Sequence, residues 1–336
     1  MAHKILVTGA GGYIGSVAVY LFLQSGYEVV AVDDFCTGYR QPLAFFTERF
    51  KGRFKYYEID LKTNKIDDVF KEEENIEAVV HYAASCIVDE SMKNPGKYFS
   101  NNVGGTNNLL SAMAYAGVKN IVFSSTCAVY GEAQYMPLDE KHPLNPTTPY
   151  GASKKMVEEI IDWYKKRKGL RYMVLRYFNV CGASDDGLIG DSKKPSTLLV
   201  QNAVRGALGI EPFKLTCPEV PTPDRTPIRD YINVVDLNDA HMKAIELLIK
   251  GAESNIINLG TGTGNSVLEI VKEVQSVTGV KFDIGKTIPR EGDDAKKIAN
   301  IDKAKDILGW EPKKTISDSV KSLVTWYKAH PHGWQS

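Results

Sequence analysis

The chain has 336 residues, of which 43% are hydrophobic, enough to bury a full core in one large domain or two closely joined domains. Its 41 basic and 41 acidic residues cancel, so no overall field would draw it to nucleic acid or to an anionic membrane surface. Any anion that it binds must be held by a local site.

The N-terminus and the cysteines predict a cytosolic protein. The start, MAHKILVTGAGGYIGS, runs directly into a strand and a turn, without the layout of a secretory signal. No apolar run approaches the roughly 18 residues of a membrane span. The cysteines are five in number and include no C-x-x-C pair, which argues against a disulfide framework and against a zinc site. We expect no metal, and we expect reduced, mostly buried thiols at Cys36, Cys86, Cys127, Cys181 and Cys217.

Short β-branched runs alternate with helical patterns in the first half of the chain. The runs are KILVT, EVVAVD, FKYYEID, EAVVHYA and NIVFSST, and a helical pattern fills residues 14–24 after the first of them. Several runs are apolar on both faces, as in a sheet that helices cover on both sides. The pattern predicts an α/β fold with a doubly wound parallel sheet (Rossmann).

A change of character after residue 178 predicts a second, smaller α/β domain that binds the substrate. Polar loops with Gly and Pro appear there, whereas DYINVVDLNDAHMKAIELL and SNIINLG again have strand and helix patterns. We therefore predict a cofactor domain over 1–178 with a returning segment around 230–262. The substrate domain then takes 179–229 and 263–336.

The first strand and turn predict a dinucleotide site. In KILVTGAGGYIGS, Gly9, Gly12 and Gly15 allow a tight turn and a close approach of backbone N–H groups to a pyrophosphate. The next strand ends in Asp33 and Asp34, which suit the ribose hydroxyls and repel the 2′-phosphate of NADP. NAD is therefore the predicted cofactor, and the nearby Arg40 is the one feature that points the other way.

A tyrosine and a lysine one helical turn apart form the candidate catalytic pair. In the helical pattern PYGASKKMVEEIIDWY, the i, i+4 spacing puts Tyr150 and Lys154 on one face. A tyrosine base must ionise about three to four pH units below its usual pKa of about 10, at a cost of roughly 4 to 5 kcal/mol, and an adjacent ammonium group supplies such stabilisation. Ser124, Ser125 and Thr126 lie where a strand ends, the position at which ligands collect in such sheets. Thr126 would hydrogen-bond the reacting oxygen and pass its proton to Tyr150.

These motifs together resemble the extended short-chain dehydrogenase/reductase family, and within it the UDP-glucose 4-epimerases. The similar segments are TGAGGYIGS, VVHYAA, NNVGGTNNLL, SSTCAVYG, PYGASK, LRYFNVCGA, PTPDRTPIRDYINVVDL, INLGTGTGNSV and PREGD. The resemblance implies Thr126, Tyr150 and Lys154 as the catalytic group. For the cofactor it implies, beside the three glycines and the two aspartates, Tyr13, Ile14, Phe35, Cys36, Thr37, Gly38, Asp60, Leu61, Tyr82, Ala83, Ala84, Asn101, Ser124, Tyr150, Lys154, Tyr177 and Phe178.

The resemblance also implies a UDP-sugar as the substrate. The implied contacts, beside Thr126 and Tyr150, are Asn179, Thr197, Leu198, Thr216, Arg229, Arg290, Asp293 and Lys297. The two arginines suit a cationic clamp on a diphosphate. This chain departs from the family at Thr216, where an aromatic side chain often lies beside uracil. It also departs at Lys297, where the family has a tyrosine or a small residue; this lysine either swings out to water or reaches a sugar hydroxyl.

The predicted reaction is inversion at C4 of a UDP-sugar, most simply the interconversion of UDP-glucose and UDP-galactose. Tyr150 takes the C4 hydroxyl proton while hydride passes to NAD, the 4-keto sugar turns, and hydride returns to the opposite face. UDP-N-acetylhexosamines, UDP-uronates and UDP-pentoses remain alternative substrates. A 4,6-dehydratase or decarboxylase is disfavoured because Cys127 and Ala128, not carboxylates, follow Thr126. A non-enzymatic NAD sensor would not need the tyrosine and lysine.

The resemblance further implies a homodimer. The two predicted helices near 101–116 and 152–166 would pack against those of a second copy as a four-helix bundle. The apolar positions Val157, Ile160, Ile161 and Tyr164 would equally fit against the chain's own sheet.

Overall fold

The computed structural model describes residues 3–193, 196–286 and 294–334, and the chain forms two compact units. The first unit takes the chain up to Gly131, then Pro143–Arg176 and Asn238–Ile257. The second takes Glu132–His142, Tyr177–Leu237 and the chain from Asn258 onward. The predicted domain ranges stay a prediction. Those ranges assign residues 132–142 to the cofactor domain, whereas the structure groups Glu132–His142 with the second unit.

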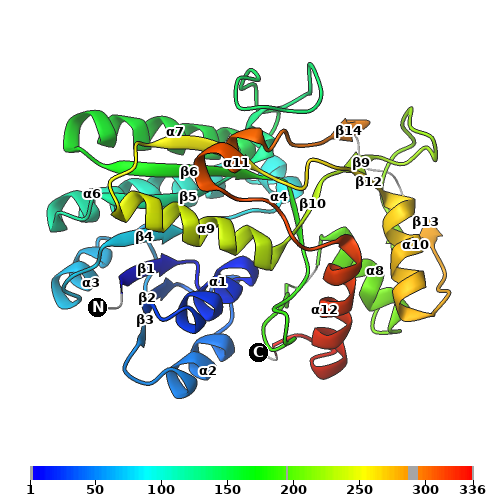
Figure 1. The fold of residues 1–336 in the computed structure, drawn as a ribbon, viewed down its shortest axis with the longest axis horizontal. Helices are drawn as coiled ribbons and strands as arrows, with labels where there is room; N and C mark the ends of the chain where they lie inside the picture. The colour runs from blue at the N-terminus through cyan, green and yellow to red at the C-terminus, as the bar shows by residue number, and fades with distance from the viewer. Residues whose placement is uncertain (1–2, 194–195, 287–293, 335–336) are drawn as a thin grey trace. The chain divides into compact units, whose positions relative to one another are not determined.

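A seven-stranded sheet with the order β11-β6-β5-β4-β1-β2-β3 forms the centre of the first unit (Figure 1). The four neighbouring pairs from β3 to β5 are parallel. The order runs outward from β1 in both directions, so the predicted doubly wound sheet is confirmed. Its strands are β1 (Lys4–Thr8), β2 (Glu28–Asp33), β3 (Phe54–Glu58), β4 (Ala78–His81), β5 (Asn120–Thr126), β6 (Arg171–Tyr177) and β11 (Asn255–Leu259).

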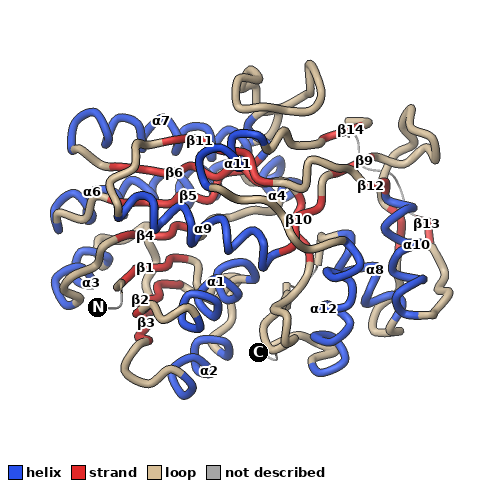
Figure 2. The backbone as a smooth tube through the Cα atoms, viewed as in Figure 1, coloured by secondary structure: helices blue, strands red, loops and turns tan. Residues whose placement is uncertain are grey.

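Helices cover both faces of this sheet, which is why its strands are apolar on both sides (Figure 2). On β5, Ser124 hydrogen-bonds His241 of α9, whereas Ser125 hydrogen-bonds Glu158 of α7. Because adjacent strand residues point to opposite faces, α9 and α7 lie on opposite sides. The helices of the unit are α1 (Tyr13–Gln24), α2 (Gln41–Arg49), α3 (Ile66–Glu72), α4 (Val88–Lys93), α5 (Pro95–Tyr98), the π-helix η1 (Phe99–Gly104), α6 (Gly105–Ala116), the 3₁₀ turn η2 (Cys127–Val129), α7 (Pro149–Lys168) and α9 (Val234–Ile249), whose first residues belong to the second unit.

One hydrophobic core of the first unit lies between the sheet and helices α3, α6 and α7. Val157 and Ile161 of α7 are fully buried in it, and Ile160 and Tyr164 pack against it. The apolar stripe named from the sequence therefore faces the chain's own sheet. The large hydrophobic side chains that α6 and α7 expose are different ones, Tyr115, Met156 and Trp163.

The second unit packs three helices around a core of its own. These are α8 (Leu199–Ala207), α10 (Val267–Thr278) and α12 (Ile316–Ala329), which contribute Val204, Val271 and Trp326 to that core. Ser266 and Thr315 each close a capping box, which defines where α10 and α12 begin. The remaining elements are α11 (Asp302–Leu308), β7 (Asn179–Cys181) paired with β10 (Tyr231–Asn233), β8 (Lys214–Leu215) paired with β13 (Gly285–Lys286), and β9 (Ile228–Arg229) between β12 (Asn265–Ser266) and β14 (Lys296–Lys297).

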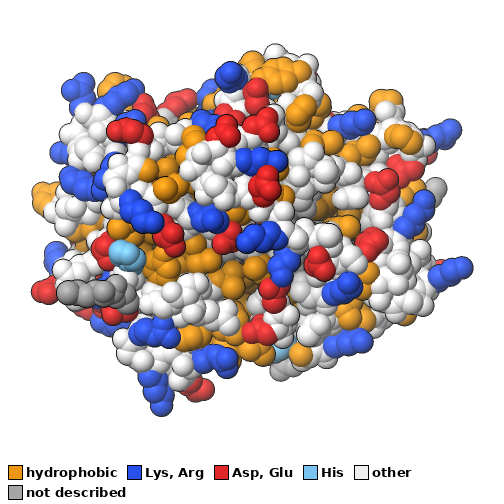
Figure 3. Space-filling view, viewed as in Figure 1, with side chains coloured by type: hydrophobic (Ala, Val, Ile, Leu, Met, Phe, Trp, Pro, Cys, Tyr) orange, Lys and Arg blue, Asp and Glu red, His pale blue; other side chains and the backbone are white. Residues whose placement is uncertain are grey.

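Basic and acidic side chains are interspersed over the face drawn in Figure 3. Among the described residues, no helix combines the length and apolar character needed to cross a bilayer. The expectation of mostly buried cysteines is wrong: only Cys181 is buried, Cys36 and Cys86 are exposed, and Cys127 and Cys217 are half-buried. Cys36 and Cys86 follow strand ends, where loops keep small side chains near the surface.

Candidate functional site

The turn after β1 is built so that two of its glycines cannot be replaced. A Cβ at Gly9, whose φ is +71°, would lie 2.6 Å from the backbone nitrogen of Ala83, and one at Gly15 would lie 2.0 Å from the carbonyl oxygen of Gly9. The turn therefore packs against the loop after β4 and directly under the start of α1. This close packing brings backbone N–H groups and a helix N-terminus together, the arrangement that holds a pyrophosphate.

Asp33 ties the loop after β2 to this glycine turn. Its carboxylate accepts hydrogen bonds from the backbone N–H of Gly11 at 2.8 Å and of Phe35 at 2.7 Å. Burial raises the pKa of Asp33, and those two hydrogen bonds oppose the rise. Asp34 instead accepts from the N–H of Cys36 at 3.0 Å and shapes the loop. A Cβ at Gly38 would lie 2.9 Å from the carbonyl carbon of Gly11, so residues 35–38 lie close over the turn.

The other predicted cofactor residues of the first unit sit at strand ends and helix starts. Tyr13 and Ile14 open α1, and Asp60 and Leu61 follow β3. Tyr82 donates to the side chain of Asn238 at 2.7 Å, and Ala83 and Ala84 continue the same loop. Asn101 lies in the π-helix η1 and donates to Ser85 of that loop at 3.2 Å. A π-helical turn often marks a functional position, and nothing in the sequence indicated it.

The predicted catalytic residues meet where β5 ends and α7 begins. Thr148 caps α7 with its side chain and Pro149 follows at the first helical position, so Tyr150 lies in the first turn. A Cβ at Gly151 would lie 2.6 Å from the carbonyl oxygen of Ala128, so this turn packs tightly on η2, directly after Thr126. The Thr126 side chain accepts a hydrogen bond from the N–H of Ala128 at 3.2 Å, which leaves its hydroxyl hydrogen for another acceptor.

Lys154 is buried beneath this turn and fastened to β5. Its ammonium donates to the carbonyl oxygen of Ser124 at 2.7 Å and lies 4.7 Å from the centre of the Phe123 ring. Burial lowers the pKa of Lys154 to about 8, while the nearby Cys86 and Glu158 act in the other direction. A cation one helical turn from a tyrosine near a helix N-terminus is an arrangement that favours an ionised phenol.

A buried ion pair behind the lysine went unnoticed in the sequence. Glu158 lies one further turn along α7 and bonds Arg176 of β6 through both of its oxygens, at 3.0 and 2.5 Å. It also accepts from Ser125 at 2.5 Å, and Arg176 donates to the Tyr130 hydroxyl at 3.2 Å. The spacing of Tyr150, Lys154 and Glu158 by four residues was the available signal, since it places all three on one helix face.

Apart from Thr126 and Tyr150, which belong to the first unit, the predicted substrate residues lie in the second unit or outside the described residues. Asn179 donates to the carbonyl oxygen of Asp230 at 3.2 Å, and Tyr177 and Phe178 precede it. Thr197 and Thr216 are exposed, and Leu198 precedes α8. Arg290 and Asp293 fall outside the described residues, so their predicted contacts stay predictions.

Arg229 and Lys297 lie opposite each other on two paired strands. The register of β9 and β14 sets them opposite each other, which gathers two cations. Arg229 donates to the carbonyl oxygen of Ile228 at 2.9 Å, and Lys297 pairs with Asp294 at 2.5 Å. In this structure the Lys297 side chain is held by the Asp294 carboxylate. The sequence had suggested two other positions, either turned out to water or directed to a sugar hydroxyl.

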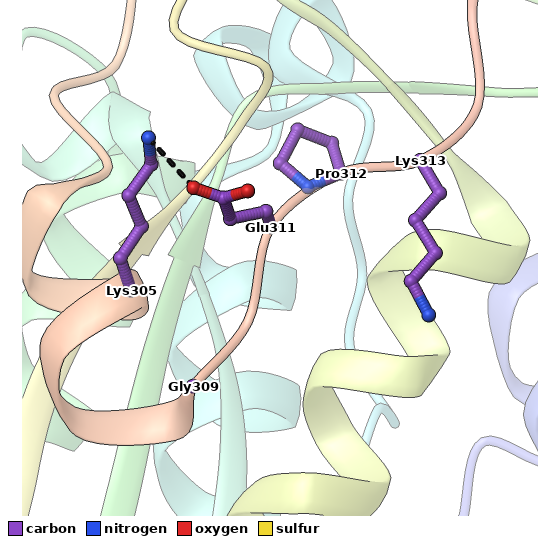
Figure 4. Close-up of a pocket in the computed structure, with 5 residues that line it drawn as sticks. All are labelled: Lys305, Gly309, Glu311, Pro312 and Lys313. Carbon is purple, nitrogen blue, oxygen red and sulfur yellow. Dashed lines mark ion pairs between the residues drawn. The ribbon is translucent and has the colours of Figure 1, made fainter.

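A pocket on the surface of the second unit is lined by none of the predicted site residues (Figure 4). Lys305, Gly309, Glu311, Pro312 and Lys313 line it, and Lys305 pairs with Glu311 at 2.9 Å. Across the described part of the chain, no three His, Cys, Asp or Glu side chains gather closely enough to hold a metal ion.

Comparison with known proteins decides the family. The sequence profile of the NAD dependent epimerase/dehydratase family matches residues 5–260. The chain belongs to this family. It is 40% identical over 334 residues to the UDP-glucose 4-epimerase of Lactobacillus helveticus, covering 99% of both chains.

Solved structures agree with this family assignment. A crystal structure of a UDP-glucose 4-epimerase superposes with a TM-score of 0.93 at 38% identity, over 99% of this chain and all of the other. The enzyme of Bifidobacterium longum, solved with NAD⁺ and UDP, gives 0.92 at 33% identity, over 98% of this chain and all of the other. The predicted membership of the extended short-chain dehydrogenase/reductase family is confirmed, and with it the prediction of an NAD-dependent nucleotide-sugar epimerase.

Proposed function

We propose that this protein interconverts UDP-glucose and UDP-galactose by oxidation and reduction at C4. The observation that carries the proposal is the hydrogen bond from the Lys154 ammonium to the Ser124 carbonyl oxygen, because it fixes a cation one turn from Tyr150 and beside Thr126. UDP-glucose 4-epimerases at about 40% identity over the full chain support the choice of substrate.

The glycine turn and Asp33 fit NAD. Gly9 and Gly15 have no side chains, so the backbone of the turn stays open to a pyrophosphate. The buried Asp33 accepts a hydrogen bond from the same turn. When bound, NAD would supply the chemistry of a reversible hydride acceptor at C4. The chain's own residues do the rest: Thr126 hydrogen-bonds the C4 oxygen, Tyr150 takes its proton, and Lys154 stabilises the phenolate. After the 4-keto sugar rotates to present its other face for reduction, Tyr150 returns the proton to the C4 oxygen.

For the diphosphate of the substrate, the proposal relies on Arg229 and on the predicted Arg290. Arg229 places positive charge on β9, and a protein of zero net charge needs such a local cation to bind a dianion. Lys297 also bears on which sugar fits, because the length of its side chain and its pairing with Asp294 determine the space beside it. N-acetylated sugars, uronates and pentoses are the substrates to compare.

We also propose a homodimer formed through α6 and α7. Met156 and Trp163 are 44% and 56% exposed, lie seven residues apart on one face of α7, and are accompanied by Tyr115 of α6 at 97% exposed. The Tyr164 hydroxyl bonds Ser111 at 2.7 Å, so the two helices present their outer faces together. A cytosolic location is part of the proposal, because the exposed Cys36 and Cys86 would be oxidised readily outside a reducing compartment.

The experiment is to incubate the purified protein, without added reductant, with UDP-glucose, UDP-N-acetylglucosamine, UDP-glucuronate and UDP-xylose. Products are separated by chromatography and identified by NMR. We expect the C4 epimer of UDP-glucose at unchanged mass. We expect Tyr150→Phe to lose about 10²- to 10⁴-fold in kcat.

The matched control is Tyr135→Phe, which removes the hydroxyl of a tyrosine that is 44% exposed and bonded to Asp139. It should keep full activity. A 4-keto-6-deoxy or decarboxylated product would replace the proposed reaction with one of its rivals. Full activity in Tyr150→Phe would remove Tyr150 from the mechanism.

A further inference from the structure

Arg40 is the cation that the sequence places near the adenosine ribose. In the dinucleotide fold, the acidic residue after the second strand binds the ribose 2′-hydroxyl, and an arginine nearby accommodates the 2′-phosphate of NADP. Here Asp33 is that acidic residue, and Arg40 ends the same loop, just before α2. Its position in the sequence alone would therefore suggest that Arg40 binds the 2′-phosphate of NADP.

The loop that carries Arg40 is folded over the glycine turn. The backbone N–H of Tyr39 donates to the carbonyl oxygen of Gly11 at 2.9 Å, and Gly11 itself donates to Asp33. Phe35 takes the left-handed conformation, with φ of +55°, and its ring lies beside Gly11. The Arg40 backbone is therefore held next to the place where the ribose is expected.

The Arg40 guanidinium is directed elsewhere, to the end of β3. Its Nε donates to one oxygen of Glu58 at 3.2 Å, and a terminal nitrogen donates to the other oxygen. The guanidinium also lies over the Phe35 ring, 4.5 Å from its centre. The two-point bond has the fixed fork geometry that arginine would otherwise offer to a phosphate.

Glu58 stands in register with Asp33, because β2 and β3 are parallel and pair Asp33 with Glu58. The two carboxylates thus flank the loop at the same edge of the sheet. The hydrogen bond from Arg40 lowers the pKa of Glu58, so the carboxylate is ionised at neutral pH. A dianionic 2′-phosphate at the end of β2 would meet Asp33 and Asp34, while Arg40 is already bound to Glu58.

We propose that Glu58 is a second determinant of cofactor choice, which favours NAD over NADP by holding the Arg40 guanidinium away from the 2′-phosphate. Asp33 discriminates by direct contact, whereas Glu58 acts through Arg40. This inference rests on the cofactor site of the proposed function and adds to it a residue on β3, outside the glycine turn and the acidic strand end.

The experiment measures which cofactor the full-length protein holds, independently of catalysis. Wild type, Glu58→Gln and the control Glu48→Gln are each dialysed to equilibrium against equal concentrations of NAD⁺ and NADP⁺. Bound cofactor is then released and quantified by liquid chromatography and mass spectrometry. Glu48 is an exposed residue of α2, so its substitution removes one negative charge without touching Arg40.

We expect Glu58→Gln to raise the ratio of bound NADP to bound NAD by about fivefold over wild type, in line with the strength of an exposed ion pair, and Glu48→Gln to leave it unchanged. The double variant Arg40→Gln/Glu58→Gln should return the ratio to that of wild type, because no guanidinium is then available. The proposal is overturned if Glu58→Gln matches the control, or if the double variant keeps the gain. Failure of wild type to bind either cofactor would instead reject the NAD site itself.

Discussion

At the scale of single residues, the proposed catalytic pair depends on a lysine whose pKa is lowered by burial. Lys154 is 3% exposed, and burial lowers its pKa to about 8. It is therefore mostly protonated at neutral pH and loses its charge as the pH rises through about 8. The negative charge of Glu158, one turn away, counteracts that loss, and Arg176 in turn holds Glu158.

We predict that Glu158→Gln lowers the pH at which activity is lost on the alkaline side. Removing the carboxylate removes a charge that favours the protonated lysine, so the lysine deprotonates at lower pH. The same change leaves Arg176 buried without its partner and should destabilise the protein by about 3 kcal/mol. The pH profile of kcat/KM and urea unfolding measure the two effects.

A double variant, Arg176→Met/Glu158→Gln, separates them. It should recover part of the stability, because no unpaired charge is then buried, but not the pH profile. An alkaline limit that stays at the wild-type pH in both variants would exclude an electrostatic effect of Glu158 on Lys154.

At the scale of elements, one carboxylate at the end of α3 joins two strands of the sheet. Glu73 accepts from Lys4 of β1 at 2.6 Å, pairs with Lys55 of β3 at 2.7 Å and accepts from the Tyr57 hydroxyl at 2.7 Å. Burial by itself would raise the pKa of Glu73, but these partners outweigh it and lower the pKa to about 2.

We predict that this cluster stabilises the fold above pH 4.5 and loses its effect as the pH falls toward 2. The sign follows because the folded state binds a proton at Glu73 less readily than the unfolded chain does. Glu73→Gln should cost about 1 to 2 kcal/mol at pH 7, a value reduced because Lys55 is exposed, and should cost nearly nothing near pH 2. Chemical unfolding at a series of pH values tests this, with the exposed Glu74→Gln as the control; equal losses at all pH values would contradict it.

At the scale of the whole molecule, the proposed dimer accounts for apolar side chains that the fold leaves in water. Trp163, at 56% exposed, has Lys166 and Arg167 over its ring and lies on the face of α7 opposite the buried Val157 and Ile161. A large apolar side chain in such a place is typical of an interface.

We predict that Trp163→Glu converts the dimer to a monomer, because it would place a charge in an apolar interface of two copies. Sedimentation velocity measures the mass, and Val280→Glu, an equally drastic change at an exposed residue of the second unit, should leave the dimer intact. A Trp163→Glu protein that still sediments as a dimer would exclude this surface.

The amino-acid sequence by itself determined the sheet, the glycine turn and the family. Alternating apolar runs, glycines at fixed spacing and a tyrosine four residues before a lysine are local patterns, and each reflects local backbone geometry or the spacing of a helix. Tertiary structure alone decided which charges meet. Glu158 and Arg176 are 18 residues apart, and so are Arg40 and Glu58. Only the packing of α7 on the sheet and the pairing of β2 with β3 bring them within hydrogen-bond distance. It also decided which apolar face of α7 is buried, since a helix with apolar residues on two sides can turn either one to its own sheet.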